Sequence, residues 1–280
     1  MFNNAIFDGF RGKPNFERLE LAQYKIDDYF YECSFPNNYS SFVYEMECVS
    51  LPISNDAFVN EGHEEIVHLG FVSYRFSNVI KNPLLPCNSQ GLLLAIVRIK
   101  QVKENIADVE SLGRILEKEY VDYYHDPNPD NKSQRGRHTE DMENAYRYAN
   151  KVWGNVPDSD DDSIEKNDYL LGSYLRSYPP IKCESVKIGK YCYSKYAEGN
   201  IDYKNTFRRF YNLPIKDNYI LSFEFKYRLE GNASKKKFRK WLLSSDETFE
   251  HKILETLDIS RLVDASTENE IAFISNQGEQ

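Results

Sequence analysis

The sequence predicts an α+β protein in which a mainly antiparallel sheet packs against several helices, as an elaborated α/β sandwich. Three observations lead to this class. Residues 218–229 alternate apolar and polar side chains, which is typical of a half-buried strand. Residues 91–99 form an almost continuous apolar run, as expected for a central strand covered on both faces. Residues 109–123 repeat apolar side chains every three or four positions, the spacing of an amphipathic helix.

The first third of the chain is predicted to be mostly strand. Residues 29–35 and 42–48 both alternate, and the polar Asn-Asn-Tyr-Ser-Ser segment between them favours an antiparallel hairpin. Residues 70–80 are rich in aromatic and β-branched side chains, so they are expected to form the next strand. The buried strand at residues 91–99 follows it.

Two helices are predicted after these strands. The first begins after Asp108, because aspartate is a favoured N-cap residue. The second begins after Thr139, has acidic residues in its first turn, and carries an apolar stripe as far as Trp153. The polar segment 125–138 between them contains two prolines and is predicted to be a loop.

The second half of the chain begins with an acidic connection and ends in a helix. Residues 154–168 carry the densest acidic run and show no periodicity, which favours an exposed connection. Residues 183–197 are expected to form two short strands around Gly189. The closing helix is predicted to begin at a capping box formed by Ser244 and Glu247. The apolar side chains of this helix are Phe249, Ile253, Leu254 and Leu257.

The chain is predicted to form a single elaborated domain over residues 16–262, with the exposed connection at 154–168. Because a length of 280 residues also allows two domains, the same connection permits two subdomains, 1–153 and 169–262. Residues 263–280 are polar and are expected to be a flexible tail.

Charge and hydropathy restrict the partners. The net charge of −9 disfavours a general affinity for nucleic acid, which depends on clustered Lys and Arg, and it favours a basic protein partner. The basic-aromatic segments 206–211 and 234–241 are expected to bury their aromatic side chains and expose their charges. No apolar run is long enough for a membrane span, and the N-terminus lacks a secretory signal. We therefore expect a cytoplasmic protein, or a periplasmic one if an export signal was removed.

The sequence matches no metal, cofactor or catalytic signature, so no cofactor and no metal are expected. His63 and His68 are five residues apart, and a helix would place them on different faces. The acidic run from Asp158 lacks the glycine and the bidentate glutamate of a calcium loop. The five cysteines are too scattered for a disulfide framework, although Cys183 and Cys192 could pair across a hairpin outside the cytoplasm.

The end of the chain resembles a known family. Residues 215–262 contain the alternating strand, a polar connection and the helical segment SSDETFEHKILETLDI, an order similar to the end of α/β-sandwich domains of the Mog1/PsbP type. Several bacterial immunity proteins that neutralise type VI secretion effectors are built on that scaffold or on related antiparallel sheets. The resemblance implies a non-enzymatic inhibitor that covers the active site of a cognate toxin.

Candidate contact residues for such a toxin lie in loops, where binding residues are most often found. They are Asp158, Asp160, Asp161 and Asp162 of the acidic run, and Tyr123, Tyr124 and His125 beside the proline-containing loop. Two alternatives stay open. One is an envelope-associated scaffold or accessory protein. The other is a hydrolase built from dispersed residues such as His125, His138 and Glu140, which requires that these groups converge in a pocket.

Overall fold

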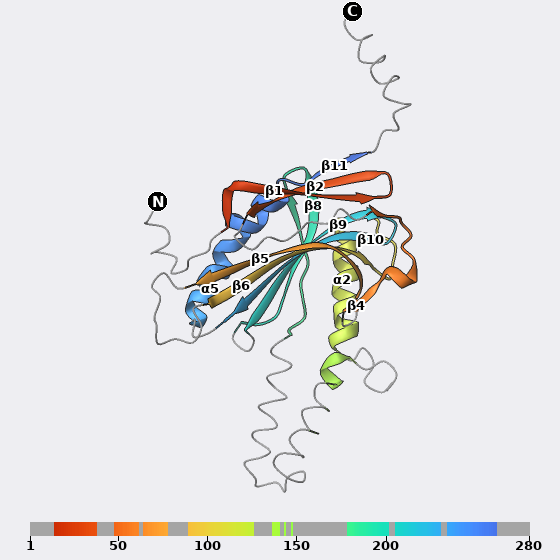
Figure 1. Cartoon of the computed structure of the whole chain (residues 1–280). Coiled ribbons are helices and arrows are strands. Elements are labelled where there is room, and N and C mark those ends of the chain that lie inside the picture. The colour runs from red at the N-terminus through yellow and green to blue at the C-terminus, as the bar shows by residue number, and fades with distance from the viewer. Residues whose placement is uncertain are drawn as a thin grey trace, which may run out of the picture.

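The fold is known from a computed structural model, which describes residues 14–37, 48–61, 64–77, 89–125, 136–140 with 143 and 147, 178–201, 205–230 and 234–261. The acidic connection at 154–168, the tail at 263–280 and His63 lie outside these residues. The α+β class predicted from the sequence is confirmed: two mostly antiparallel sheets pack with helices (Figure 1).

A seven-stranded antiparallel sheet forms the centre of the molecule. Its strand order is β4-β5-β6-β10-β9-β8-β7, so two meanders meet where β6 pairs with β10. The strands are β4 (Val59–Glu61), β5 (Glu64–Ser77), β6 (Ser89–Gln101), β7 (Glu184–Ile188), β8 (Tyr191–Glu198), β9 (Thr206–Lys216) and β10 (Tyr219–Leu229). The large sheet therefore contains the central strand predicted at residues 91–99 and the two strands predicted around Gly189.

A second sheet of four strands lies against one face of the large sheet (Figure 1). Its order is β11-β2-β1-β3. The strands are β1 (Asn15–Ile26), β2 (Tyr29–Asn37), β3 (Cys48–Val49) and β11 (Asp258–Arg261). We call this layer the small sheet.

Of the strand predicted at residues 42–48, only Cys48 lies within the described residues, and it pairs with Lys25 of β1 rather than with the predicted partner strand. β2 pairs with β1, through a two-residue turn at Asp27 and Asp28, and with β11 on its other side. Asp27 adopts the left-handed conformation (φ 48°) that tight hairpin turns require. β1 gives no clean alternation in the sequence because Leu19 and Leu21 point outward while the other face of the strand is buried.

Helices cover both faces of the large sheet. α2 (Val109–Tyr124) lies on the face opposite the small sheet, and its predicted cap is confirmed. Asp108 Oδ1 accepts a hydrogen bond from Ser111 N at 2.7 Å, and Ser111 Oγ accepts one from Asp108 N at 2.9 Å. On the small-sheet side lie α5 (Lys235–Ser245), a π-helical turn (Asp246–Glu250) and α6 (His251–Leu254). None of the described helices has the length and apolarity needed to cross a bilayer.

Two predicted helix starts are wrong. The closing helix begins at Lys235, and the hydroxyl of Ser244 donates to the Trp241 carbonyl inside it instead of capping a new helix. The other helix is already helical at residue 137, so Thr139 lies within its first turn. There the carbonyl of Gly136 accepts hydrogen bonds from Thr139 N and Glu140 N.

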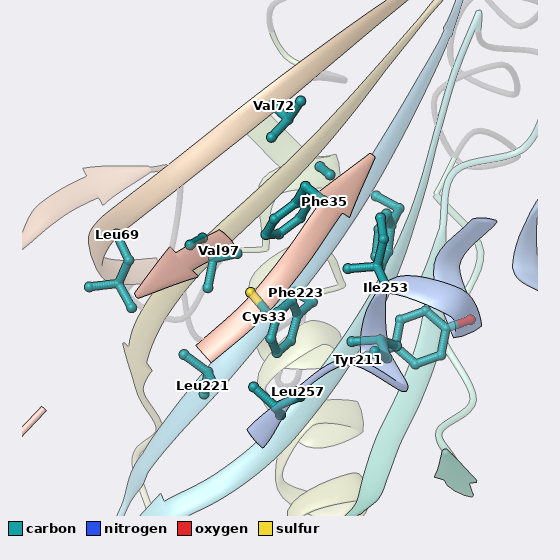
Figure 2. Close-up of a cluster of buried hydrophobic side chains, with 14 of the residues drawn as sticks. Cys33, Phe35, Leu69, Val72, Val97, Tyr211, Leu221, Phe223, Ile253 and Leu257 are labelled. Atoms are coloured by element: carbon teal, nitrogen blue, oxygen red, sulfur yellow. The ribbon is translucent and has the colours of Figure 1, made fainter. Parts of the chain in front are cut away.

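The main hydrophobic core lies between the large sheet, the small sheet and the α5–α6 segment. Figure 2 shows Cys33 and Phe35 of β2 close to Leu221 and Phe223 of β10, with Ile253 of α6 beside them. The four apolar residues predicted for the closing helix are all buried in this core. Full burial of each large apolar side chain contributes about 1.5–3 kcal/mol, so this core fixes the small sheet and α6 in place.

β10 is more deeply buried than its alternation predicts. Its apolar face enters the main core as expected, but Ser222 and Glu224 on the other face are only 2 % exposed. Ile220 and Phe210 on that face pack with apolar side chains of α2 in a smaller cluster. Glu224 lies on the same face of the sheet and has Arg98 and Arg208 of the neighbouring strands as ion-pair partners.

Cys183 and Cys192 are both free thiols. The register of the β7–β8 hairpin pairs Cys192 with Lys187, whereas Cys183 precedes the first residue of β7. The two thiols therefore lie at different levels of the hairpin. Burial raises the pKa of Cys183 to about 12.

Candidate functional site

Charged residues that are buried or half-buried gather on the face of the large sheet that α2 contacts. They come from the four neighbouring strands β6, β10, β9 and β8. Together with one tyrosine of α2 they form what we call the α2-face cluster: Arg98 of β6, Glu224 of β10, Arg208 of β9, Glu198 of β8 and Tyr124.

Positive and negative groups alternate along the α2-face cluster. Arg98 forms a buried ion pair with Glu224. Arg208 bridges the two carboxylates, with Nη1 3.7 Å from Glu224 Oε1 and Nη2 3.5 Å from Glu198 Oε1. The hydroxyl of Tyr124 donates to Glu198 Oε1 at 2.9 Å. The two arginines and two glutamates of the cluster therefore balance in charge.

The electrostatics of the α2-face cluster favour a fixed structure. Burial raises the pKa of Tyr124 and the neighbouring charge of Glu198 raises it further, so the hydroxyl keeps its proton and remains a donor. Removing charged groups from water is unfavourable unless each group finds a partner of opposite charge. The ion pairs accordingly join neighbouring strands, and the Tyr124–Glu198 hydrogen bond joins the end of α2 to β8.

A second charged contact holds the middle of α2. Lys100 Nζ of β6 lies 3.4 Å from Glu119 Oε2, and the backbone N–H of Lys103 donates to Glu119 Oε1 at 2.7 Å. Two residues earlier in α2, Glu117 Oε1 accepts a hydrogen bond from Cys183 N at 2.6 Å. These contacts connect α2 to both halves of the large sheet.

Aromatic and histidine rings surround the C-terminal end of α2. The Tyr124 ring stacks on Tyr178 with ring centres 5.0 Å apart, and His138 Nε2 lies 3.2 Å from the Tyr178 carbonyl oxygen. The rings of His125 and His138 meet edge to face at 4.8 Å. Burial lowers the pKa of His125, which favours the neutral imidazole at pH 7.

The structure brings together two of the three residues considered for a hydrolase. His125 and His138 are in contact, but Glu140 is exposed and forms an ion pair with Arg137 at 2.8 Å. The carboxylate that belongs to the same group of side chains is Glu198, through Tyr124. Within the described ranges, no three His, Cys, Asp or Glu side chains are grouped so that they could hold a metal ion.

The predicted partner-contact residues fall into two groups. Asp158, Asp160, Asp161 and Asp162 lie outside the described residues. Tyr124 is buried in the α2-face cluster, whereas Tyr123 and His125 at the end of α2 are half-buried. Their role as partner contacts stays a prediction.

The outer face of the small sheet carries exposed apolar side chains that the sequence analysis missed. Leu19 is 47 % exposed and Leu21 is 55 % exposed, and their spacing of two residues places them on the same face of β1. The other face of β1 packs into the main core through Ala22, Tyr24 and Ile26. We call the exposed side the Leu19–Leu21 face.

A third feature, on the small-sheet side of the large sheet, is a fully buried carboxylate. Glu250, in the π-helical turn, accepts hydrogen bonds from Arg209 Nη1 at 2.7 Å and from the hydroxyls of Tyr211 and Tyr227 at 2.7 and 2.5 Å. Arg209 also donates to the Leu242 carbonyl at 2.6 Å. Both carboxylate oxygens are therefore used in holding the helical segment against β9 and β10.

One signal in the sequence could have located the α2-face cluster. Arg98 interrupts an otherwise apolar run in a central strand, and a charge there requires a buried partner. That partner, Glu224, stands on the polar side of a strand read as half-exposed. The position of Arg98 therefore predicts a buried ion pair, but it does not identify the acidic partner.

The fold and these sites define an α+β protein with two mostly antiparallel sheets, a charge-balanced interior cluster and an exposed apolar sheet face. Comparison of the chain with protein-family models, with curated proteins and with solved structures finds no match in any of the three.

Proposed function

We propose that this chain is a non-enzymatic binding protein that neutralises a cognate bacterial toxin by covering the toxin's active site. The observation that carries the proposal is the Leu19–Leu21 face. Single exposed apolar side chains are ordinary, but neighbouring ones on an exposed sheet face form a surface suited to a partner protein. The small sheet would present this surface while its other face stays fixed in the core.

Charge supports a basic partner. The chain carries a net charge of −9. Complementary charge around an apolar contact speeds encounter and excludes partners of like charge. A toxin with a basic active-site cleft matches these properties.

The assignment of the partner as a toxin rests on the resemblance of residues 215–262 to the Mog1/PsbP type. The observed order of a long strand, a connection and a helical segment that packs back on the sheet agrees with that resemblance. The charge balance of the α2-face cluster also supports binding over catalysis, because each carboxylate there is already neutralised by an arginine.

The test is co-purification of the tagged full chain with the product of the adjacent gene, followed by an assay of toxin activity. We expect a one-to-one complex and loss of toxicity. Because a charge in an apolar contact is strongly unfavourable, Leu19→Asp with Leu21→Asp should weaken binding at least tenfold. Leu243→Asp, at an exposed apolar position on α5, is the matched control and should bind normally. Equal binding by both variants would refute the assignment of this face.

A hydrolase is the second candidate, because His125, His138 and Tyr124 meet beside Glu198. It predicts turnover of ester or phosphate substrates by the purified chain, lost in His138→Ala and retained in Glu140→Gln. Turnover with this pattern would replace the binding proposal. Absence of turnover together with toxin neutralisation would reject the hydrolase.

A further inference from the structure

The exposed face of α5 carries a concentrated group of cations. Lys236, Lys237, Arg239 and Lys240 are exposed within five consecutive residues, and Leu243, one turn further on, is 80 % exposed. Lys236, Lys240 and Leu243 follow the three- and four-residue spacing of one helix face. We call these five residues the α5 basic face.

Local helix stability does not account for this group. The first turn of α5 contains lysines and no acidic residue. Cations near a helix N-terminus oppose the helix dipole, and neighbouring like charges repel one another. The cluster also stands out in a chain whose net charge is −9. An anionic partner at this face would offset both unfavourable terms.

The opposite side of α5 fixes the helix firmly on the sheet. Phe238 and Leu242 are buried, and the Trp241 ring packs against Phe76 and Tyr227 with ring centres 4.5 and 5.1 Å apart. Lys235 turns inward, where its ammonium donates to the Ile201 carbonyl at 2.7 Å. The α5 basic face is thus held in place at the side of the molecule (Figure 1).

We propose that the α5 basic face binds the surface of a membrane rich in anionic lipid. The four cations would contact the headgroup phosphates and carboxylates, and Leu243 would enter the boundary between headgroups and acyl chains. Groups of four or more Lys and Arg on an amphipathic helix are suited to such surfaces, and an exposed leucine adds apolar anchoring.

The aromatic residues of this segment disfavour single-stranded nucleic acid as the partner. Proteins that bind such strands offer exposed aromatic rings on which bases stack. Here Phe238 is fully buried and Trp241 is held between core side chains, as the sequence analysis expected. The remaining apolar group on the exposed side is aliphatic, which suits lipid better than bases.

The test uses the purified full chain and flotation with vesicles of phosphatidylcholine containing 30 % phosphatidylserine (a chosen composition of about one anionic lipid in three). We expect binding at low salt, loss at high salt, and no binding to pure phosphatidylcholine. Each cation near an anionic surface strengthens binding about fivefold, so Lys236→Gln with Lys240→Gln should lower the partition coefficient about 25-fold. Leu243→Ser should lower it roughly tenfold, because one exposed apolar anchor is lost.

Lys182→Gln with Lys187→Gln is the matched control, since both lysines are exposed away from α5. This variant should bind vesicles almost as the unaltered chain does. Failure to bind anionic vesicles, or equal effects of the two double variants, would overturn the proposal. Binding to a thymidine oligonucleotide but not to vesicles would overturn the choice of lipid. Because the Leu19–Leu21 face is unaltered in every variant, toxin neutralisation is expected to persist in all of them.

Discussion

Replacing Glu250 with glutamine removes the charge that three donors share in the interior. Arg209, which is itself buried, would lose its carboxylate contact at 2.7 Å and keep the Leu242 carbonyl, a neutral acceptor. The amide of glutamine can still accept from one tyrosine hydroxyl, but its NH₂ group would face the second. The change therefore leaves a buried cation without a counterion.

The magnitude follows from the burial of both partners. Breaking a buried ion pair by removing one partner destabilises a protein by about 3–5 kcal/mol. Partial retention of the tyrosine hydrogen bonds places Glu250→Gln near the lower end, about 3 kcal/mol. With a denaturant slope near 3 kcal/mol per molar urea for a chain of this size, the unfolding midpoint should fall by roughly 1 M.

The assay is urea unfolding followed by circular dichroism. Glu255→Gln is the matched control, because it makes the same chemical change at an exposed position five residues away. Its free energy of unfolding should change by no more than about 0.5 kcal/mol. If Glu250→Gln shifts the midpoint no further than Glu255→Gln does, Glu250 does not hold the α5–α6 segment on the sheet.

Three further predictions concern α2 and its surroundings. A hydrogen bond from the backbone N–H of Ser111 lowers the pKa of Asp108 below its ordinary 3.8, so the charge of Asp108 stabilises the fold above that pH. The melting temperature of the unaltered chain should exceed that of Asp108→Asn by an amount that shrinks as the pH falls below 3.8. A difference that does not change with pH would contradict this. A Cβ added at Gly136 would lie 2.5 Å from the carbonyl carbon of His125. Gly136→Ala should therefore lower the free energy of unfolding, measured in urea, by about 1–3 kcal/mol. An unchanged midpoint would show that the contact is absent. A double-mutant cycle of Tyr124→Phe and Glu198→Gln should give a coupling of at least about 1 kcal/mol, and strict additivity would mean that the hydrogen bond contributes nothing.

Local patterns in the sequence predicted the elements whose surroundings are simple. β10 was recognised because its apolar and polar side chains alternate, β6 because its apolar run is almost continuous, and α2 because its cap and its apolar stripe agree. β1 was missed because leucines lie on its outer face, which removes the alternation that marks a half-buried strand. The start of α5 was missed because its first turn is basic, contrary to the usual charge preference of helix ends.

The sites depend on contacts between distant segments, which local patterns do not contain. Glu224 looks like a solvent-facing residue in the sequence, and its partners Arg98 and Arg208 stand on the neighbouring strands β6 and β9. Glu198 and Arg208 meet through the pairing of β8 with β9, and the histidines approach only because residue 136 lies beside the end of α2. Hydrophobic periodicity indicates which face of a strand or helix is buried. The partners in an ion pair depend on which strands and helices lie side by side in the fold.

Hydrogen–deuterium exchange of the full chain, with and without its cognate toxin, tests the central claim that this protein acts by binding a partner through the Leu19–Leu21 face. Slower exchange is expected in residues 17–25 of β1 on complex formation, and unchanged exchange in α5. Protection elsewhere with unaltered exchange in β1 would contradict it.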